Sequence, residues 1–296
     1  MSSLKLRSML FVPADSERKL AKSVQSMADV LILDLEDSVA ESRKAGARGT
    51  AAEFIRAQAD ALASRIFVRI NPLDTTLAMH DLAAVVAPGL AGVMLPKIRS
   101  AADIVQLGHC LDALEARAGM AAGTVRIVPV ATETPQAMLA MQAFSAPQPP
   151  NSRLAGITWG AEDLSAAIGA VSNRETSGEY SPLYTWANSL CLCAAAAAGV
   201  PAIDTLHIDF RDTAGLEAAC RASRRRGFRG RIAIHPDQVA TINVAYAPSE
   251  AELAHARRVV DAFAAQPDAG TLSLDGLMVD KPHLTQALQT LDMAAA

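Results

Sequence analysis

Short apolar runs alternate with amphipathic stretches along most of the chain. Eight runs rich in Val, Ile and Leu predict β-strands, and they cover residues 8–12, 30–35, 66–70, 92–95, 125–130, 156–159, 202–206 and 232–234. Helical periodicity follows between them, as in residues 15–27, 42–62, 101–118, 134–144, 181–198 and 213–226. Because parallel strands need crossover helices, this alternation predicts an α/β fold, the (β/α)8 TIM barrel. A doubly wound open sheet is the alternative, but no G-x-G-x-x-G turn follows the first strand.

The barrel pattern stops after residue 247. Ser249 and Glu252 have the spacing of a capping box, which predicts a helix at this point. We therefore assign residues 1–247 to the barrel and residues 248–296 to a short helical C-terminal extension. The extension is too short to bury a core alone, so we expect it to pack on the barrel or on a neighbouring subunit.

Two loops interrupt the alternation. Residues 145–153 carry three prolines and are expected to form an extended surface connection. Residues 172–182 follow the sixth predicted strand, so they are expected to overhang the carboxyl ends of the strands as a lid.

Composition narrows the class of protein. The chain is 51% hydrophobic but only 4% aromatic, which predicts an aliphatic core. A net charge of −4, from 27 basic and 31 acidic residues, argues against nucleic acid and anionic membranes as partners. The four cysteines have no CxxC spacing, and neither a secretory signal nor an apolar run of about 20 residues is present, so we expect reduced thiols and a cytoplasmic location.

Charged residues stand where the apolar runs end. The second run ends in Asp34, Glu36 and Asp37, and later runs end near Glu133 and Asp163. Reacting groups of a TIM barrel collect at the carboxyl ends of its strands, and neighbouring strands lie about 5 Å apart. Glu133 and Asp163 could therefore share one hard cation such as Mg²⁺. The competing interpretation is that Asp163 only caps a helix.

Basic residues at the strand ends have two interpretations each. The guanidinium of Arg69 suits a substrate carboxylate, or an ion pair with Asp34 or Glu36, and the two interpretations are compatible. Lys44 and Lys97 are expected to pair with the same acids.

Two further basic features are expected to be structural. His235, at the end of the last predicted strand, is more plausible as a structural histidine than as a base. The arginines between residues 224 and 231 are expected to form a solvated helix end.

Taken together, the motifs resemble the citrate lyase beta-subunit and malyl-CoA lyase family of CoA-ester lyases, within the HpcH/HpaI aldolase superfamily. The resemblance runs from Arg7 to His283. The matching segments are RSMLFVPADSERK, DVLILDLEDSV with Lys44 after it, VRINP, GVMLPK, the pair Glu133-Thr134, WGAEDL, GRIAIHPDQ and GLMVDKPH. Their order and spacing make the joint match specific.

The resemblance implies a set of roles at the strand ends. Glu133 and Asp163 would carry Mg²⁺, with Mn²⁺ as an alternative, and Glu133 would also border the substrate. Arg69 would hold the carboxylate of a 2-oxo acid. Asp34, Glu36 and Lys44 would fix Arg69 and metal-bound waters.

The resemblance also implies roles away from the barrel mouth. Arg18, Lys19 and Lys22 would contact the phosphates of coenzyme A. Asp280, in the GLMVDKPH segment, would reach the active site of an adjacent subunit as proton donor or acceptor, which predicts a homotrimer or hexamer.

The resulting hypothesis is a Mg²⁺-dependent lyase that splits a malyl-CoA-like or citramalyl-CoA-like thioester into acetyl-CoA and a 2-oxo acid. Its partners would be small molecules, an acyl-CoA and a 2-oxo acid. Three alternatives stay open: a citryl-thioester lyase subunit, a hydroxy-oxo-acid aldolase that never uses CoA, and a non-catalytic barrel that binds a metabolite.

Overall fold

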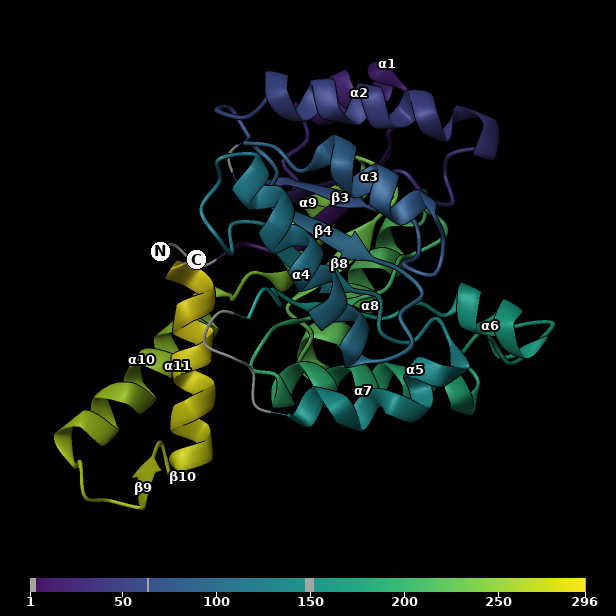
Figure 1. Cartoon of the computed structure of the whole chain (residues 1–296). Coiled ribbons are helices and arrows are strands. Elements are labelled where there is room, and N and C mark those ends of the chain that lie inside the picture. Colours follow the sequence, from purple (N-terminus) through teal and green to yellow (C-terminus); the bar gives the residue numbers. More distant parts are fainter. Residues whose placement is uncertain (1–3, 63, 147–151, 296) are drawn as a thin grey trace. The chain divides into compact units, whose positions relative to one another are not determined.

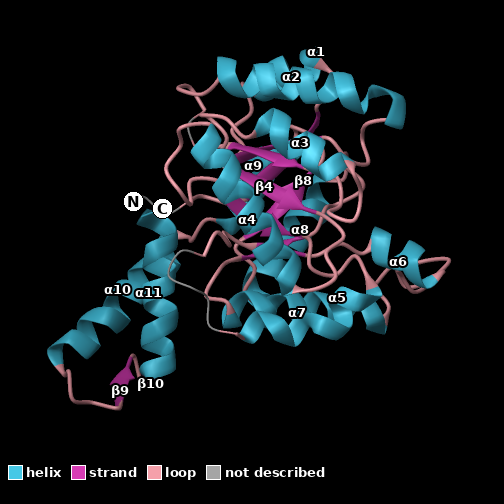
Figure 2. Cartoon of the chain, in the orientation of Figure 1, coloured by secondary structure: helices cyan, strands magenta, loops and turns pink. Residues whose placement is uncertain are grey.

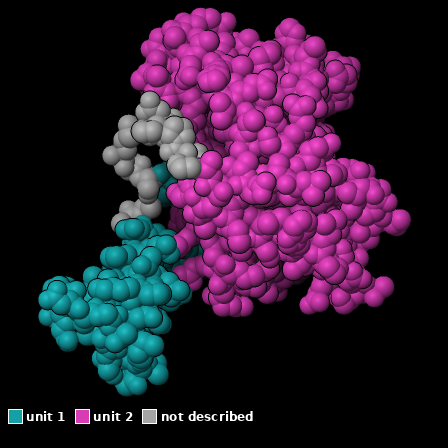
Figure 3. All heavy atoms as spheres, turned by 60° about the horizontal axis from the view of Figure 1, so that its bottom comes forward, with its two compact units in different colours: residues 1–5, 244–296 teal, residues 6–243 magenta. Residues whose placement is uncertain are grey.

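The structure is a computed structural model that describes residues 4–62, 64–146 and 152–295. The chain forms two compact units, coloured separately in Figure 3: residues 6–243, and residues 244–296 together with residues 1–5. Most of the proline-rich loop predicted at residues 145–153 lies outside the described residues. Within the described part of the chain, no helix is both long enough and apolar enough to pass through a bilayer.

The larger unit is built on one sheet of eight parallel strands, which confirms the predicted barrel (Figures 1 and 2). Its strands are β1 (Ser8–Pro13), β2 (Val30–Asp34), β3 (Ile66–Arg69), β4 (Gly92–Leu95), β5 (Arg126–Pro129), β6 (Ile157–Thr158), β7 (Ala202–Asp204) and β8 (Gly230–Ala233). They follow the order β5-β4-β3-β2-β1-β8-β7-β6. Single parallel bridges, Ile127 to Leu154 and Val130 to Thr158, join the two ends and close the ring.

Helices separate the strands and lie around them in Figure 1. They are α1 (Glu17–Ser23), α2 (Lys44–Ala57), α3 (Leu77–Val85), α4 (Ala101–Arg117), α5 (Pro135–Ala140), α6 (Glu162–Ile168), α7 (Pro182–Ala197), α8 (Thr213–Arg226) and α9 (Gln238–Tyr246). Short 3₁₀ turns, η1 (Glu41–Arg43) and η2 (Met141–Ser145), adjoin α2 and α5. The helix α8 ends where predicted, because Gly227 takes the left-handed conformation (φ 118°) that closes a helix.

Gly92 leaves room for a neighbouring aromatic ring inside the barrel. The register pairs Phe67 of β3 with Gly92 of β4. A Cβ added at Gly92 would lie only 2.2 Å from the Phe67 ring, so any larger residue at this position must displace that ring. The strand β2 is buried along its whole length, which explains why its sequence is apolar on both faces up to Asp34.

The smaller unit contains α10 (Glu250–Ala265), a hairpin of β9 (Thr271–Leu274) and β10 (Leu277–Asp280), and α11 (Lys281–Ala295). The predicted capping box is present: Ser249 accepts a hydrogen bond from the Glu252 backbone and the Glu252 carboxylate accepts one from Ser249. These elements share a small apolar cluster of their own, formed by Ala256, Val259, Phe263, Val279 and Ala287.

Candidate functional site

A cavity of about 450 Å³ opens at the carboxyl ends of the barrel strands. TIM-barrel enzymes keep their active sites at this end. The lining combines acids and one guanidinium with apolar side chains from the barrel interior. It consists of Phe11, Pro13, Asp34, Asp37, Ser38, Arg69, Met94, Val130, Glu133, Thr158, Trp159, Gly160, Ala161, Glu162, Asp163, Thr205, Leu206, Ile232 and Ile234.

Arg69 is held on two sides by acids, as one of its two interpretations expected. The register places Asp34 of β2 beside Arg69 of β3. Arg69 Nε and Nη2 each donate to a different Asp34 oxygen at 2.7 Å, and Nη1 forms an ion pair with Glu36 at 2.9 Å. The guanidinium also lies 4.6 Å from the centre of the Phe11 ring. These contacts fix the plane of Arg69 at the edge of the cavity.

Asp34 is stabilised as an anion in spite of its burial. It accepts hydrogen bonds from the backbone N–H groups of Glu36 (3.0 Å) and Ser38 (3.1 Å) as well as from Arg69. Burial pushes the pKa of Asp34 up, but the hydrogen bonds and charge of Arg69 outweigh it and hold the pKa below its ordinary value. Burial dominates at Glu36 and raises its pKa to about 7, although Arg69 and Lys97 oppose the rise.

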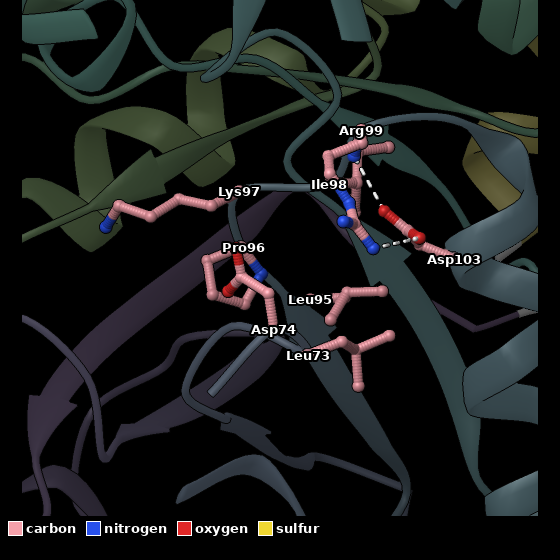
Figure 4. A pocket seen from close by; sticks show the side chains of 8 residues that line it. All are labelled: Leu73, Asp74, Leu95, Pro96, Lys97, Ile98, Arg99 and Asp103. Carbon is pink, nitrogen blue, oxygen red and sulfur yellow. Dashed lines mark hydrogen bonds and ion pairs between the residues drawn. The ribbon is translucent and has the colours of Figure 1, made fainter. Parts of the chain in front are cut away.

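Lys97 contacts three acids from different parts of the cavity: Glu36, which follows β2, Glu133, which follows β5, and Asp163 of α6. The Lys97 backbone has a positive φ of 50°, a conformation that is uncommon for residues other than glycine. The Lys97 N–H donates to Glu133 at 2.6 Å, while its ammonium pairs with Glu36 and lies 3.1 Å from Asp163. In Figure 4 the Lys97 side chain extends away from Arg99 and its partner Asp103, which border a separate shallow pocket.

Glu133 and Asp163 form the pair of acids that the sequence proposed for a metal. Both line the cavity and both lie within hydrogen-bond distance of Lys97. Burial, followed by the nearby charge of Asp163, raises the pKa of Glu133 well above its ordinary value. Asp163 lies in the first turn of α6, whose N-cap is Ala161, so the interpretation of Asp163 as a helix cap is wrong.

The chemistry of this pair fits a hard divalent cation. Two carboxylates whose charges repel one another in a buried setting gain from an ion between them, and Mg²⁺ characteristically takes one or two protein carboxylates while waters and substrate oxygens complete its shell. Within the described residues no group of three or more His, Cys, Asp or Glu side chains is arranged around a common point. A metal here would therefore depend on Glu133, Asp163 and oxygens from outside the protein.

Lys44 has a different role from the expected ion pair. Its ammonium is buried and donates to the carbonyl oxygens of Leu35 (2.9 Å) and Glu36 (2.9 Å) and to the Asn71 side chain (2.8 Å). Asn71 in turn donates to Asp81, a fully buried acid on α3 that the sequence analysis missed. The network fixes the backbone from which Glu36 reaches Arg69, but the ammonium of Lys44 bonds carbonyl and amide oxygens in it and no carboxylate.

Arg231 was wrongly expected at a solvated helix end. It is buried on β8 and pairs with Asp204 of β7, and its Nη1 donates to the carbonyl oxygen of Thr205 at 3.0 Å. Asp204 also accepts a hydrogen bond of 2.7 Å from the indole of Trp159. This ion pair therefore anchors the strand that leads into the cavity wall.

The loop predicted as a lid is a small hairpin in the structure. Arg174 and Tyr180 form an antiparallel bridge, and the Arg174 guanidinium lies 4.0 Å from the centre of the Tyr180 ring. Tyr180 packs edge-on against Trp159, with ring centres 5.2 Å apart. Asn173 donates to Glu162 at 2.9 Å. The hairpin thus contacts two residues that line the cavity, while its movement stays a prediction.

The remaining candidates lie outside the cavity lining. Arg18, Lys19 and Lys22 are exposed on α1. Asp280 belongs to the smaller unit, where its carboxylate lies 2.5 Å from the ring of His283. His235 stacks on Phe210 with ring centres 4.6 Å apart, in agreement with a structural histidine.

Comparisons with known proteins identify the same family that the sequence motifs resemble. The family model described as HpcH/HpaI aldolase/citrate lyase matches residues 7–236. A citrate lyase subunit beta-like protein of Mycobacterium tuberculosis is 36% identical over 278 residues, which cover 94% of this chain and 92% of that protein. A (3S)-malyl-CoA thioesterase of Cereibacter sphaeroides is 33% identical, over 98% of this chain and 95% of that protein.

A similar solved structure is the CitE protein of Mycobacterium tuberculosis in complex with magnesium, acetoacetate and coenzyme A. It is 34% identical, covers 99% of both chains and superimposes with a TM-score of 0.77. Magnesium and coenzyme A, both expected from the sequence of the present chain, are thus bound by this relative.

Proposed function

We propose that this chain, which belongs to the HpcH/HpaI aldolase/citrate lyase family and is a carbon–carbon lyase of that type, is a magnesium-dependent CoA-ester lyase. It splits a malyl-CoA-like or citramalyl-CoA-like thioester reversibly into acetyl-CoA and a 2-oxo acid. One observation carries the proposal: Arg69 shares a single cavity with Glu133 and Asp163. The cavity therefore offers a cation for a carboxylate beside oxygen ligands for a divalent ion.

The residues of the cavity have different roles. Glu133 and Asp163 would hold Mg²⁺, with Mn²⁺ as an alternative, and the bound ion would supply a Lewis acid for the oxygen that becomes the carbonyl of the oxo acid. Arg69 binds the substrate carboxylate and orients the bond between C2 and C3 for cleavage. Asp34 and Glu36 keep the guanidinium in place, because each pairs with a different side of it.

Cleavage turns the substrate hydroxyl into the carbonyl of the oxo acid, which releases one proton, and leaves the bonding electrons on the methylene carbon of the acetyl group, which must take up one proton. From the family resemblance we assign this proton transfer to Asp280, acting in the active site of an adjacent copy. Arg18, Lys19 and Lys22 are exposed and so are available to the phosphates of coenzyme A. The trimer or hexamer and the cytoplasmic location stay predictions.

The proposal is tested by incubating the purified chain with Mg²⁺ and malyl-CoA or citramalyl-CoA. We expect acetyl-CoA and glyoxylate or pyruvate to appear in equal amounts, and we expect chelation of the metal to stop the reaction. Product formation that persists after complete removal of the metal contradicts the mechanism.

Hydrolysis of the thioester is a second candidate function, because relatives that cover 98% of this chain are named (3S)-malyl-CoA thioesterases. The same incubation separates the two reactions. A lyase releases glyoxylate and acetyl-CoA from malyl-CoA, whereas a thioesterase releases malate and free CoA.

The three alternatives from the sequence have their own signatures. A citryl-thioester lyase subunit would need its acyl group on a partner protein, so turnover of free CoA esters argues against it. A CoA-independent aldolase would cleave a free hydroxy-oxo acid and ignore CoA esters. A non-catalytic barrel would turn over none of these compounds and would keep its role after Glu133→Ala.

A further inference from the structure

Part of the cavity lining is apolar and carries one hydroxyl group. We call it the floor, and it consists of Phe11, Met94, Val130, Thr158 and Ile232. All but Phe11 are buried, which marks them as part of the barrel interior. The floor differs in chemistry from the charged part of the lining, which contains Arg69, Glu133 and Asp163.

The strand registers determine which way Thr158 points. Arg69 pairs with Met94, and Val130 pairs with Thr158. Met94 pairs with Val128, two residues before Val130. Because side chains alternate along a strand, Met94, Val130 and Thr158 face the same side as Arg69, which is the interior of the barrel. The Thr158 side chain therefore points into the cavity rather than toward the surrounding helices.

The Thr158 hydroxyl is buried and has no hydrogen-bond partner among the residues that the structure describes. The residue is 2% exposed, and its Oγ1 is among the described buried polar atoms without a partner. A buried hydroxyl without a partner is costly, so such a group in the lining of an active-site cavity is suited to a ligand. Thr158 also stands two residues before Gly160, which lies close to Glu133, and it lines the same cavity as Glu133 and Asp163.

Charge limits what the floor accepts. Among the described residues that line the cavity, Arg69 is the only cation. Asp34 accepts hydrogen bonds from Nε and Nη2 of Arg69, and Glu36 pairs with its Nη1. The remaining N–H groups of Arg69 suffice for one further carboxylate. The other described residues of the lining are acidic, apolar or uncharged, so a second substrate carboxylate would find no further cation there.

We propose that Thr158 is the specificity-determining residue of this site: its hydroxyl hydrogen-bonds the oxo-acid part of the substrate, and the floor around it favours hydrogen or methyl over a charged substituent. This inference rests on the proposed lyase function. It selects substrates with one free carboxylate, whose cleavage yields glyoxylate or pyruvate, over those that yield the dicarboxylate oxaloacetate.

The test compares Thr158→Val, which keeps the shape but removes the hydroxyl, with Thr158→Ser, which keeps the hydroxyl. In the condensation direction we expect Thr158→Val to raise the KM for glyoxylate and pyruvate roughly tenfold, as loss of one hydrogen bond predicts. The KM for acetyl-CoA and the Tm should stay near the wild-type values, because the hydroxyl has no partner in the described part of the chain. Thr158→Ser should keep most of the affinity for the oxo acid. An unchanged KM in Thr158→Val overturns the assignment.

The substituent preference is tested with malyl-CoA, citramalyl-CoA and citryl-CoA on the wild-type chain. We expect the kcat/KM for citryl-CoA to be at least on the order of tenfold below the other two, and citryl-CoA as the best substrate overturns the inference. If no ester releases acetyl-CoA, the lyase function itself fails. Calorimetric binding of pyruvate and oxaloacetate in the presence of Mg²⁺ then still decides the preference, and tighter binding of oxaloacetate refutes it.

Discussion

Replacement of Asp34 by Asn is the sharpest probe of the Arg69 cluster. Four N–H groups point at the two carboxylate oxygens of Asp34, two from Arg69 and one each from the backbones of Glu36 and Ser38. Asparagine has a single acceptor oxygen, so its own NH₂ group would face some of these donors. Breaking a buried ion pair on one side costs about 3–5 kcal/mol, and we expect Asp34→Asn to lose that much free energy of unfolding at pH 7.

Urea denaturation at several pH values measures this loss and its sign. The pKa of Asp34 in the folded protein lies below its ordinary value of 3.8, so the carboxylate contributes stability above that pH and loses it as the pH falls through the folded pKa. The difference between the wild type and Asp34→Asn should therefore be full at pH 7 and shrink below about pH 4. Asp74, exposed just beyond β3, provides the control, and Asp74→Asn should change stability by less than about 0.5 kcal/mol. A loss of similar size for the two variants would show that the contacts of Asp34 with Arg69 and the backbone add no stability of their own.

Three further substitutions test neighbouring parts of the structure. Gly160→Ala would place a Cβ 3.0 Å from Glu133 Cγ, and we expect kcat/KM to fall on the order of tenfold with little change in Tm; an unchanged rate contradicts the close packing. Gly92→Ala should cost about 1–3 kcal/mol in urea denaturation through its clash with Phe67, and the second change Phe67→Leu should recover part of it. Lys44→Met removes a donor from three buried acceptors, of which the Leu35 and Glu36 carbonyls keep hydrogen bonds from Asn71 and Val39, and should cost about 1–3 kcal/mol by the same measurement.

The sequence was sufficient to predict the barrel and the charged residues at the carboxyl ends of its strands. A strand buried on both faces must be apolar, so the run that ends in Asp34 could be recognised, and Arg69 and Glu133 follow similar runs. Parallel strands bring their carboxyl ends to one edge, which predicts that Asp34 and Arg69 lie together.

Other features depend on the register or on distant partners. Arg231 looks like its neighbours in a basic run, because nothing in the local sequence reveals that Asp204 lies beside it on the next strand. The sequence did not indicate Thr158 as a site residue, since only the pairing of strands determines that it faces inward. The left-handed backbone of Lys97, which aims its N–H at Glu133, follows from the packing of the strand ends and from no property of lysine.

We propose that Glu133 and Asp163 together hold one divalent cation beside Arg69. Calorimetric titration of Mg²⁺ into the wild type, Glu133→Ala, Asp163→Ala and the control Glu162→Ala tests it without reference to any substrate. Glu162 lines the same cavity and is held by Asn173, so it is a matched acid with no assigned role at the metal. We expect one Mg²⁺ per chain in the wild type and in Glu162→Ala and none in the other two. Mg²⁺ binding that survives in Glu133→Ala or Asp163→Ala would show that these carboxylates do not hold the ion.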